Sequence, residues 1–279
     1  MSTATLPHAT WRARLRRPRL QLRHLLLGAF VGLVVLYLIL PTLFIIPMSL
    51  NSSPSLGTLK DGWTLRWYLT LAQDPVWRKT ASISLQVGLA STALATVVGT
   101  AFTLGLVRLS PRIRAFLQGL SLAPLAIPPV ILGIGLYILF LNLDLYRTMA
   151  SFILAHAVLA LPFVVVSVSA SLSEFDPNQE RAALVIGATP LQTFRRVVLP
   201  QIAPGIIAGA LFGFVSSWDE VVVSTFLVSP GMKTLPVEMW TQSRTTLTPV
   251  LAALSTVLMV ISTMLLLVIS RLQSRGKDQ

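Results

Sequence analysis

The sequence contains no cysteine. This absence excludes disulfides, a thiol nucleophile, and zinc or iron–sulfur sites built on thiolates. Charge is also scarce, since only 11% of the 279 residues are Asp, Glu, Lys or Arg, whereas 54% are apolar. Soluble domains carry about 25% charged residues. The chain is therefore expected to lie in a lipid bilayer.

Acidic residues are the rarer charged class, with 10 Asp and Glu against 22 Lys and Arg and a formal net charge of +12. In a soluble protein this balance would suggest a nucleic-acid partner. Here the basic residues lie at the ends of apolar runs, which membrane topology explains better. No nucleic-acid partner is expected.

Six apolar runs are long enough to cross a bilayer as helices, which takes about 20 residues. They are Leu25 to Met48, Ala81 to Val107, Phe116 to Leu141, Met149 to Ala170, Ile202 to Leu227, and Val250 to Ile269. This pattern predicts an all-α polytopic membrane protein. One transmembrane domain, 25–270, follows a basic arm, 1–24, and precedes a short tail, 271–279.

The basic residues also predict the orientation of these helices. The segments 1–24, 108–115, 171–201 and 270–279 hold 15 of the 22 Lys and Arg residues. Basic residues concentrate on the cytoplasmic side, so both termini are expected inside. The first apolar run is too long for a signal-peptide core and is expected to remain as an uncleaved helix. Prolines within the runs favour kinks.

The longest predicted cytoplasmic loop, 171–201, carries two helix starts. Asp176 and Pro177 supply an N-cap and a first helical residue, and Gly187 supplies a left-handed stop. Thr189 and Pro190 repeat the start, and Pro200 with Pro204 is expected to end the second helix. An ordered elbow of this length is typical of a docking segment, although an amphipathic elbow on lipid is the alternative.

The same loop resembles the EAA loop of ABC-importer permeases. The resemblance lies in Arg181-Ala182-Ala183, then Gly187, then Val197 and Leu199-Pro200 at the family's spacing. It implies that the elbow couples to a cytoplasmic ATPase through Glu180, Arg181, Ala182, Ala183, Gly187, Ala188, Thr189, Pro190 and Leu191. Arg181 stands where the family has glutamate, which reverses one charge at this surface.

Two carboxylates, Asp219 and Glu220, interrupt the fifth apolar run. Each costs on the order of 3 kcal/mol inside a membrane, so a functional role is the default hypothesis. A carboxylate lining a pathway stabilises a cationic solute in place of water. The alternatives are a structural pair or a carboxylate that reaches the outer interface. On one continuous helix, only one of the two would line the pathway.

Several stretches resemble the C-type permease of spermidine/putrescine importers. They are Glu174 to Asn178, Ser217 to Val222, Thr234 to Val237, Gly62 to Tyr68 and Pro124 to Gly133. The resemblance implies a linear polycation as substrate, which the charges of Asp219 and Glu220 suit. The predicted pathway consists of Asp219, Glu220, Ser217, Trp218 and Trp67. The two tryptophans would add cation–π contacts, and for Trp67 anchoring at the membrane interface is the alternative role. Related permeases carry opines, aminobutyrate, aminoethylphosphonate, ferric ion or thiamine, and these remain alternative substrates.

The resemblance also implies the type I importer fold and a set of partners in the bacterial cytoplasmic, or inner, membrane. These are a second homologous permease, two copies of a cytoplasmic ATPase, a periplasmic or extracellular solute-binding protein, and membrane lipid. The chain has no Gly-x-x-x-x-Gly-Lys-Ser/Thr loop, so ATP and Mg are expected to be used by the ATPase. The chain itself is expected to be no enzyme and to bind no cofactor or metal.

Two other classes use polytopic helices. A six-helix membrane enzyme would need a catalytic pair or metal motif in the bilayer, which adjacent Asp219 and Glu220 do not supply. A secondary transporter could use the carboxylates but leaves the elbow unexplained. His156 is expected to form a hydrogen bond between helices rather than to bind metal, and Glu238, Trp240 and Arg244 lie in the last outer loop.

Overall fold

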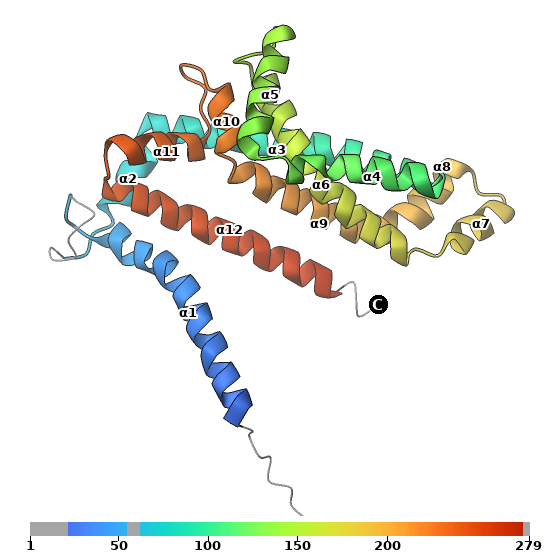
Figure 1. Cartoon of the computed structure of the whole chain (residues 1–279), viewed down its shortest axis with the longest axis horizontal. Helices are drawn as coiled ribbons and strands as arrows, with labels where there is room; N and C mark the ends of the chain where they lie inside the picture. Colours follow the sequence, from blue (N-terminus) through green and yellow to red (C-terminus); the bar gives the residue numbers. More distant parts are fainter. Residues whose placement is uncertain (1–21, 55–61, 276–279) are drawn as a thin grey trace, which may run out of the picture. The chain divides into compact units, whose positions relative to one another are not determined.

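The computed structural model describes residues 22–54 and 62–275, and within these ranges every regular element is a helix (Figure 1). The all-α prediction is therefore confirmed. Most of the predicted N-terminal arm lies outside the described residues. The chain forms two compact units, Met1–Ile45 and Ile46–Gln279, which are described separately. The first unit contains most of α1, Leu22–Leu50.

Four described helices are long and apolar enough to cross a membrane: His24–Leu50 in α1, α3 (Pro75–Leu106), α6 (Met149–Glu174), and Pro190–Trp218. A bent pair, α4 (Pro111–Ala126) and α5 (Pro129–Asn142), adds a fifth crossing if it is one span. In α12, Pro249–Arg275, residues Pro249–Met264 form a shorter apolar helix. The count of six spans and the orientation stay predictions.

The predicted third span is not one continuous helix. The axes of α4 and α5 differ by 103° (Figure 1). Ile127 and Pro128 are extended between them, with ψ of 131° and 130°. Two successive prolines, Pro128 and Pro129, lack backbone donors, and each disfavours a helical conformation in the residue before it. The predicted kink is therefore a sharp turn.

The packed centre of the second unit is formed by α3, α6 and α9 (Leu199–Trp218), which lie side by side. Small residues permit this approach, because a Cβ on Gly209 would lie 2.8 Å from the Cα of Val164. Gly213 meets Ala160 of α6 in the same way. These glycines therefore allow α9 to approach α6 closely.

The elbow has the predicted start and stop signals. The Asp176 side chain accepts a hydrogen bond from Asn178 N at the start of α7, Pro177–Val185. Gly187 has φ of +92°, and the amides of Gly187 and Ala188 donate to the carbonyls of Leu184 and Ala183. This is a Schellman motif. Thr189 then forms a capping box with Gln192 at the start of α8, Pro190–Thr193.

The predicted end of the second elbow helix at Pro200 and Pro204 is wrong. After α8, a π-helical segment, Phe194–Val198, leads directly into α9. Leu199 N bonds to Phe194 O across this segment, which lies just before Pro200. A π turn of this kind changes the backbone register and accommodates the missing donor without ending the helix.

The predicted continuous helix from Ile202 to Leu227 is also wrong. Helix α9 ends at Trp218, and α10, Val222–Leu227, begins after a break. Two short helices complete the unit: α2, Arg66–Gln73, and α11, Leu235–Thr245. The break places both predicted carboxylates outside regular helix.

Candidate functional site

The two carboxylates at the helix break have different local partners. The Oε1 atom of Glu220 accepts a hydrogen bond of 2.7 Å from Val223 N, in the first turn of α10. Glu220 therefore satisfies a donor that the start of a helix leaves without an intrahelical partner. Asp219 forms the C-cap of α9, with its backbone amide bonded to Val215 O at 3.1 Å. Glu220 is thus assigned to capping, and Asp219 is left as the open carboxylate.

Asp219 is exposed, and no described residue forms an ion pair with it. Its position at the C-terminal end of α9 adds its charge to the partial negative charge of the last carbonyls. A carboxylate there interacts unfavourably with the helix end, and a cation close by would offset this repulsion. In transporters, the C-terminal ends of broken helices and unwound backbone carbonyls coordinate cations.

The structure places the other predicted pathway residues of this stretch in the interior. The side chain of Ser217 is 5% exposed and bonds to His156 and Ser91. The Trp218 ring is stacked on Phe214 with centroids 5.6 Å apart, and it belongs to an apolar cluster with Trp77. These two side chains support the break from its packed side.

Trp67, the remaining predicted pathway residue, lies on α2. Its indole nitrogen donates to the backbone carbonyl of Asn51 at 2.7 Å. The guanidinium of Arg66 lies 4.3 Å from its ring centroid. One face of the ring therefore already carries a cation–π contact, and the ring packs against the apolar cluster that contains Trp218.

The prediction for His156 is confirmed. Its two ring nitrogens lie 2.7 Å from Ser217 Oγ and 2.8 Å from Ser224 Oγ, so the ring joins α6 to α9 and α10. Sequence reasoning missed Ser224, because a serine in an apolar helix carries no signal of its partner. Within residues 22–54 and 62–275, no group of three or more His, Asp or Glu side chains converges as metal ligands would.

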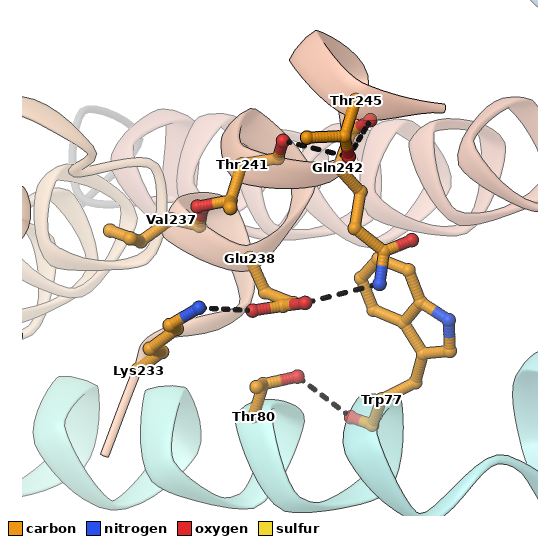
Figure 2. Close-up of polar contacts among 8 residues, drawn as sticks. All are labelled: Trp77, Thr80, Lys233, Val237, Glu238, Thr241, Gln242 and Thr245. Carbon is orange, nitrogen blue, oxygen red and sulfur yellow. Dashed lines mark hydrogen bonds and ion pairs between the residues drawn. The ribbon is translucent and has the colours of Figure 1, made fainter. Parts of the chain in front are cut away.

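The last predicted outer loop contains α11, which is tied to α3. Figure 2 shows Glu238 between two partners, Lys233 Nζ at 3.1 Å and Gln242 Nε2 at 3.1 Å. The backbone amide of Leu235 donates to Ser84 Oγ at 2.7 Å. Glu238 is only 8% exposed, so its carboxylate serves the local fold. The guanidinium of Arg244 lies 4.4 Å from the Trp240 ring centroid.

The elbow presents apolar side chains to its surroundings. Val185 and Ile186 are each 86% exposed, and Leu191 is 66% exposed. Val185 and Ile186 lie within the predicted coupling range, between Ala183 and Gly187, but are not residues of the motif itself. Arg181 extends from the same helix and donates to Asn178 Oδ1 at 3.5 Å. An exposed cluster of this composition is typical of a protein contact surface.

The elbow and the carboxylate lie at opposite ends of one helical segment. Helical structure is continuous from Pro190 to Trp218, a stretch of 29 residues. At about 1.5 Å per residue, this segment is about 43 Å long. Within this segment, Gln201 Nε2 donates a hydrogen bond to Gln179 Oε1 of α7. One continuous helical segment therefore joins the elbow to the break that contains Asp219.

Comparisons with known proteins identify the family of this chain. Residues 91–278 match the family described as the binding-protein-dependent transport system inner membrane component. The spermidine/putrescine transport system permease protein PotC of Escherichia coli strain K12 is 32% identical over 233 residues, covering 84% of this chain and 88% of PotC. The putrescine transport system permease protein PotI of the same strain is 35% identical over 230 residues, with coverages of 79% and 81%.

A solved structure shares the fold at low sequence identity. A bacterial alginate ABC transporter, in complex with a periplasmic protein bound to an alginate pentasaccharide, matches with a TM-score of 0.70 and 16% identity. The match covers 91% of this chain and 94% of that one. Because alginate is an acidic polysaccharide, the fold alone does not determine the charge of the substrate. The chain belongs to the inner membrane components of binding-protein-dependent transport systems and is a multi-pass, non-catalytic permease subunit of an ABC importer in the bacterial inner membrane.

Proposed function

We propose that this chain is a permease subunit of a polyamine importer that carries spermidine or putrescine. The observation that carries the proposal is Asp219, an exposed carboxylate at the C-terminal end of α9 without an ion-pair partner among the described residues. The resemblance to PotC and PotI supports the same substrate class.

The chemistry of a polyamine suits this position. Each ammonium group loses water when it enters a narrow path between helices, and that loss is unfavourable unless another group replaces the water. A carboxylate and the terminal carbonyls of α9 offer both charge and hydrogen-bond acceptors. Glu220 keeps its bond to α10, so a single ammonium at a time is bound at the break.

The elbow is proposed to contact a cytoplasmic ATPase, two copies of which serve this chain and a second homologous permease. Val185 and Ile186 supply apolar contact area, and Glu180 and Arg181 supply charge beside it. Residues Ala182, Ala183, Ala188, Thr189, Pro190 and Leu191 complete this surface around Gly187. ATP and Mg are bound by the ATPase in this scheme.

Alternating access follows from the continuity of the long helix. A periplasmic binding protein delivers the cation to the outward side. Closure of the ATPase pair on ATP displaces the elbows, and the continuous helical segment from Pro190 to Trp218 transmits that displacement to the break. Asp219 then changes its exposure from one side of the membrane to the other, and hydrolysis resets the permeases.

The test is ATP-dependent uptake of labelled putrescine and spermidine into proteoliposomes that contain the complete complex and its binding protein. Asp219→Asn keeps the size of the side chain and removes its charge. We expect uptake to fall by about tenfold or more, because one charge-assisted contact is worth about 1.5–3 kcal/mol. Assembly with the ATPase should remain normal.

The matched control is Asp144→Asn. Asp144 is also exposed, and its φ of 54° is one that asparagine tolerates. Its uptake should equal that of the wild type. Normal polyamine uptake by Asp219→Asn would contradict the site. A wild-type complex that hydrolyses ATP but imports neither polyamine would contradict the substrate and leave the permease assignment in place.

A further inference from the structure

The break between α9 and α10 is bridged from its packed side by one side chain, His156 of α6. Its Nδ1 lies 2.7 Å from Ser217 Oγ, in the last turn of α9. Its Nε2 lies 2.8 Å from Ser224 Oγ, in the first turn of α10. The imidazole thus binds the hydroxyl of Ser217 before the break and that of Ser224 after it, and Asp219 lies between these two residues in the sequence.

The surroundings make both contacts strongly preferred. His156 is 1% exposed and Ser224 is fully buried. Neighbouring side chains of the same core, including Phe152, Val223 and Leu227, are apolar. A ring nitrogen that lost its serine would be unpaired in this environment, which is unfavourable. Ser91 of α3 adds a third helix by donating to Ser217 Oγ at 3.3 Å.

We propose that His156 is a positioning residue for substrate transfer, which sets the angle between α9 and α10 and so the direction of the Asp219 carboxylate. The inference rests on the proposed role of Asp219 in binding a cation. Asp219 has no ion-pair partner of its own in the described chain, so its place depends on the backbone to either side. That backbone is held to α6 through Ser217 and Ser224.

Packing alone would not require this chemistry. A side chain that only fills space among Phe152 and Leu227 would be replaceable by leucine. The observed ring instead uses opposite nitrogens for hydroxyls on two separate helices, a requirement that few side chains meet. Glu220, bonded to Val223 N, strengthens the start of α10 beside the bridge.

The experiment uses the complete complex and the absence of native cysteine. Spin labels are placed at Ile207→Cys on α9 and Thr225→Cys on α10, two exposed positions, and the distance distribution between them is measured. Uptake kinetics are recorded for the unlabelled variants. His156→Leu and Ser224→Ala remove the bridge to α10, and His156→Gln restores an amide that can reach Ser224.

We expect His156→Leu and Ser224→Ala to broaden the label distance and to raise the KM for putrescine about tenfold, as loss of one buried hydrogen bond predicts. Maximal rate and the amount of assembled complex should change less. His156→Gln should recover part of both effects. The matched control is Ser255→Ala, because that hydroxyl bonds to Leu251 O of its own helix.

An unchanged label distance in His156→Leu and Ser224→Ala would overturn the proposal. A fall in the amount of folded complex, with KM and label distance unchanged, would also overturn it, because it would show a packing role alone. The distance measurement needs no substrate. If the wild type imports no polyamine, the substrate assignment fails while the bridge is still tested by the labels.

Discussion

The elbow around Gly187 and the break at Asp219 both interrupt helices, yet they are built in opposite ways. The elbow is exposed, and its turn is made by neighbours in sequence: Asp176, Gly187 and Thr189 each act on amides or dihedrals within a few residues. The break contains neither glycine nor proline. It is held by His156, a residue more than 60 positions away from both serines.

The difference follows from the surrounding medium. Water satisfies the free backbone groups of an exposed turn, so local signals are sufficient to form it. Inside a membrane protein, a broken helix is tolerated only where other protein groups satisfy the freed donors and acceptors. A break within the packed helices therefore depends on residues from several helices, and the following substitutions test that contrast.

The largest effect is expected at Gly187, where proline cannot adopt the observed φ of +92°. Gly187→Pro should distort the elbow at a local cost of about 3 kcal/mol or more. We expect uptake to be lost while the ATPase continues to hydrolyse ATP, because the distorted elbow no longer transmits the movement of the ATPase to the permease. ATP hydrolysis and uptake are measured together on the same proteoliposomes.

The control at this position is Gly187→Asn, since asparagine tolerates a left-handed conformation better than other residues with a Cβ. It should retain most coupled transport. If both variants lost transport equally, the position would have to be free of any side chain, and a left-handed backbone would not be the requirement. The local explanation of the elbow would then be wrong.

A smaller effect is expected where tertiary contact decides the structure. A Cβ on Gly209 would lie 2.8 Å from the Cα of Val164, a backbone atom that cannot move alone. Gly209→Ala should therefore lower stability by about 1–3 kcal/mol. The measurement is thermal unfolding of the purified protein in detergent, followed by circular dichroism.

Gly119→Ala is the comparison variant. Nothing in the described chain lies within 4 Å of a Cβ at Gly119, within α4. Alanine there should raise helix stability by up to about 1 kcal/mol, because glycine is a poor helix former. If both variants shifted the unfolding temperature in the same direction, close packing of α9 on α6 would not explain the effect.

The smallest effect is expected at the elbow cap. Thr189→Ala removes the side chain that accepts from Gln192 N at 3.3 Å. The loss should be about 1 kcal/mol and confined to α8, because the cap acts on its own turn. Hydrogen exchange should accelerate at Gln192 and leave α9 unchanged.

Thr70→Ala serves as its control, since that hydroxyl bonds to Arg66 O within α2 and caps no helix start. It should not alter exchange at the elbow. Faster exchange throughout α9 in Thr189→Ala would contradict the local account and would show that the elbow and the long helix unfold as one unit.

Several features of the elbow were predictable because their causes are short-range. The N-cap at Asp176, the stop at Gly187 and the new start at Thr189 each depend on residue type within one turn. The same short-range reasoning gave a wrong prediction at Pro200. A proline predicts the end of a helix, but the π segment before it accommodates the missing donor, and the propensity of a single residue does not reveal that segment.

The break shows the reverse. The costs of Asp219 and Glu220 in a membrane mark a site in the sequence, but hydropathy favours an uninterrupted helix through them. Because α9 ends at Trp218, Glu220 caps Val223 N and Asp219 lies in a different environment. No short-range sequence pattern predicts either feature.

By itself, the sequence determined that the protein is helical, lies in a membrane, and carries an exposed elbow with a glycine stop. The length of an apolar run and the capping of a helix both depend on residues that are neighbours in the sequence. Only the tertiary structure decided that α9 ends at Trp218, that Asp219 and Glu220 have separate surroundings, and that Ser217 and Ser224 meet His156. The physical reason is that a buried polar group is stable only with a partner, and that partner comes from whichever helix the packing brings beside it.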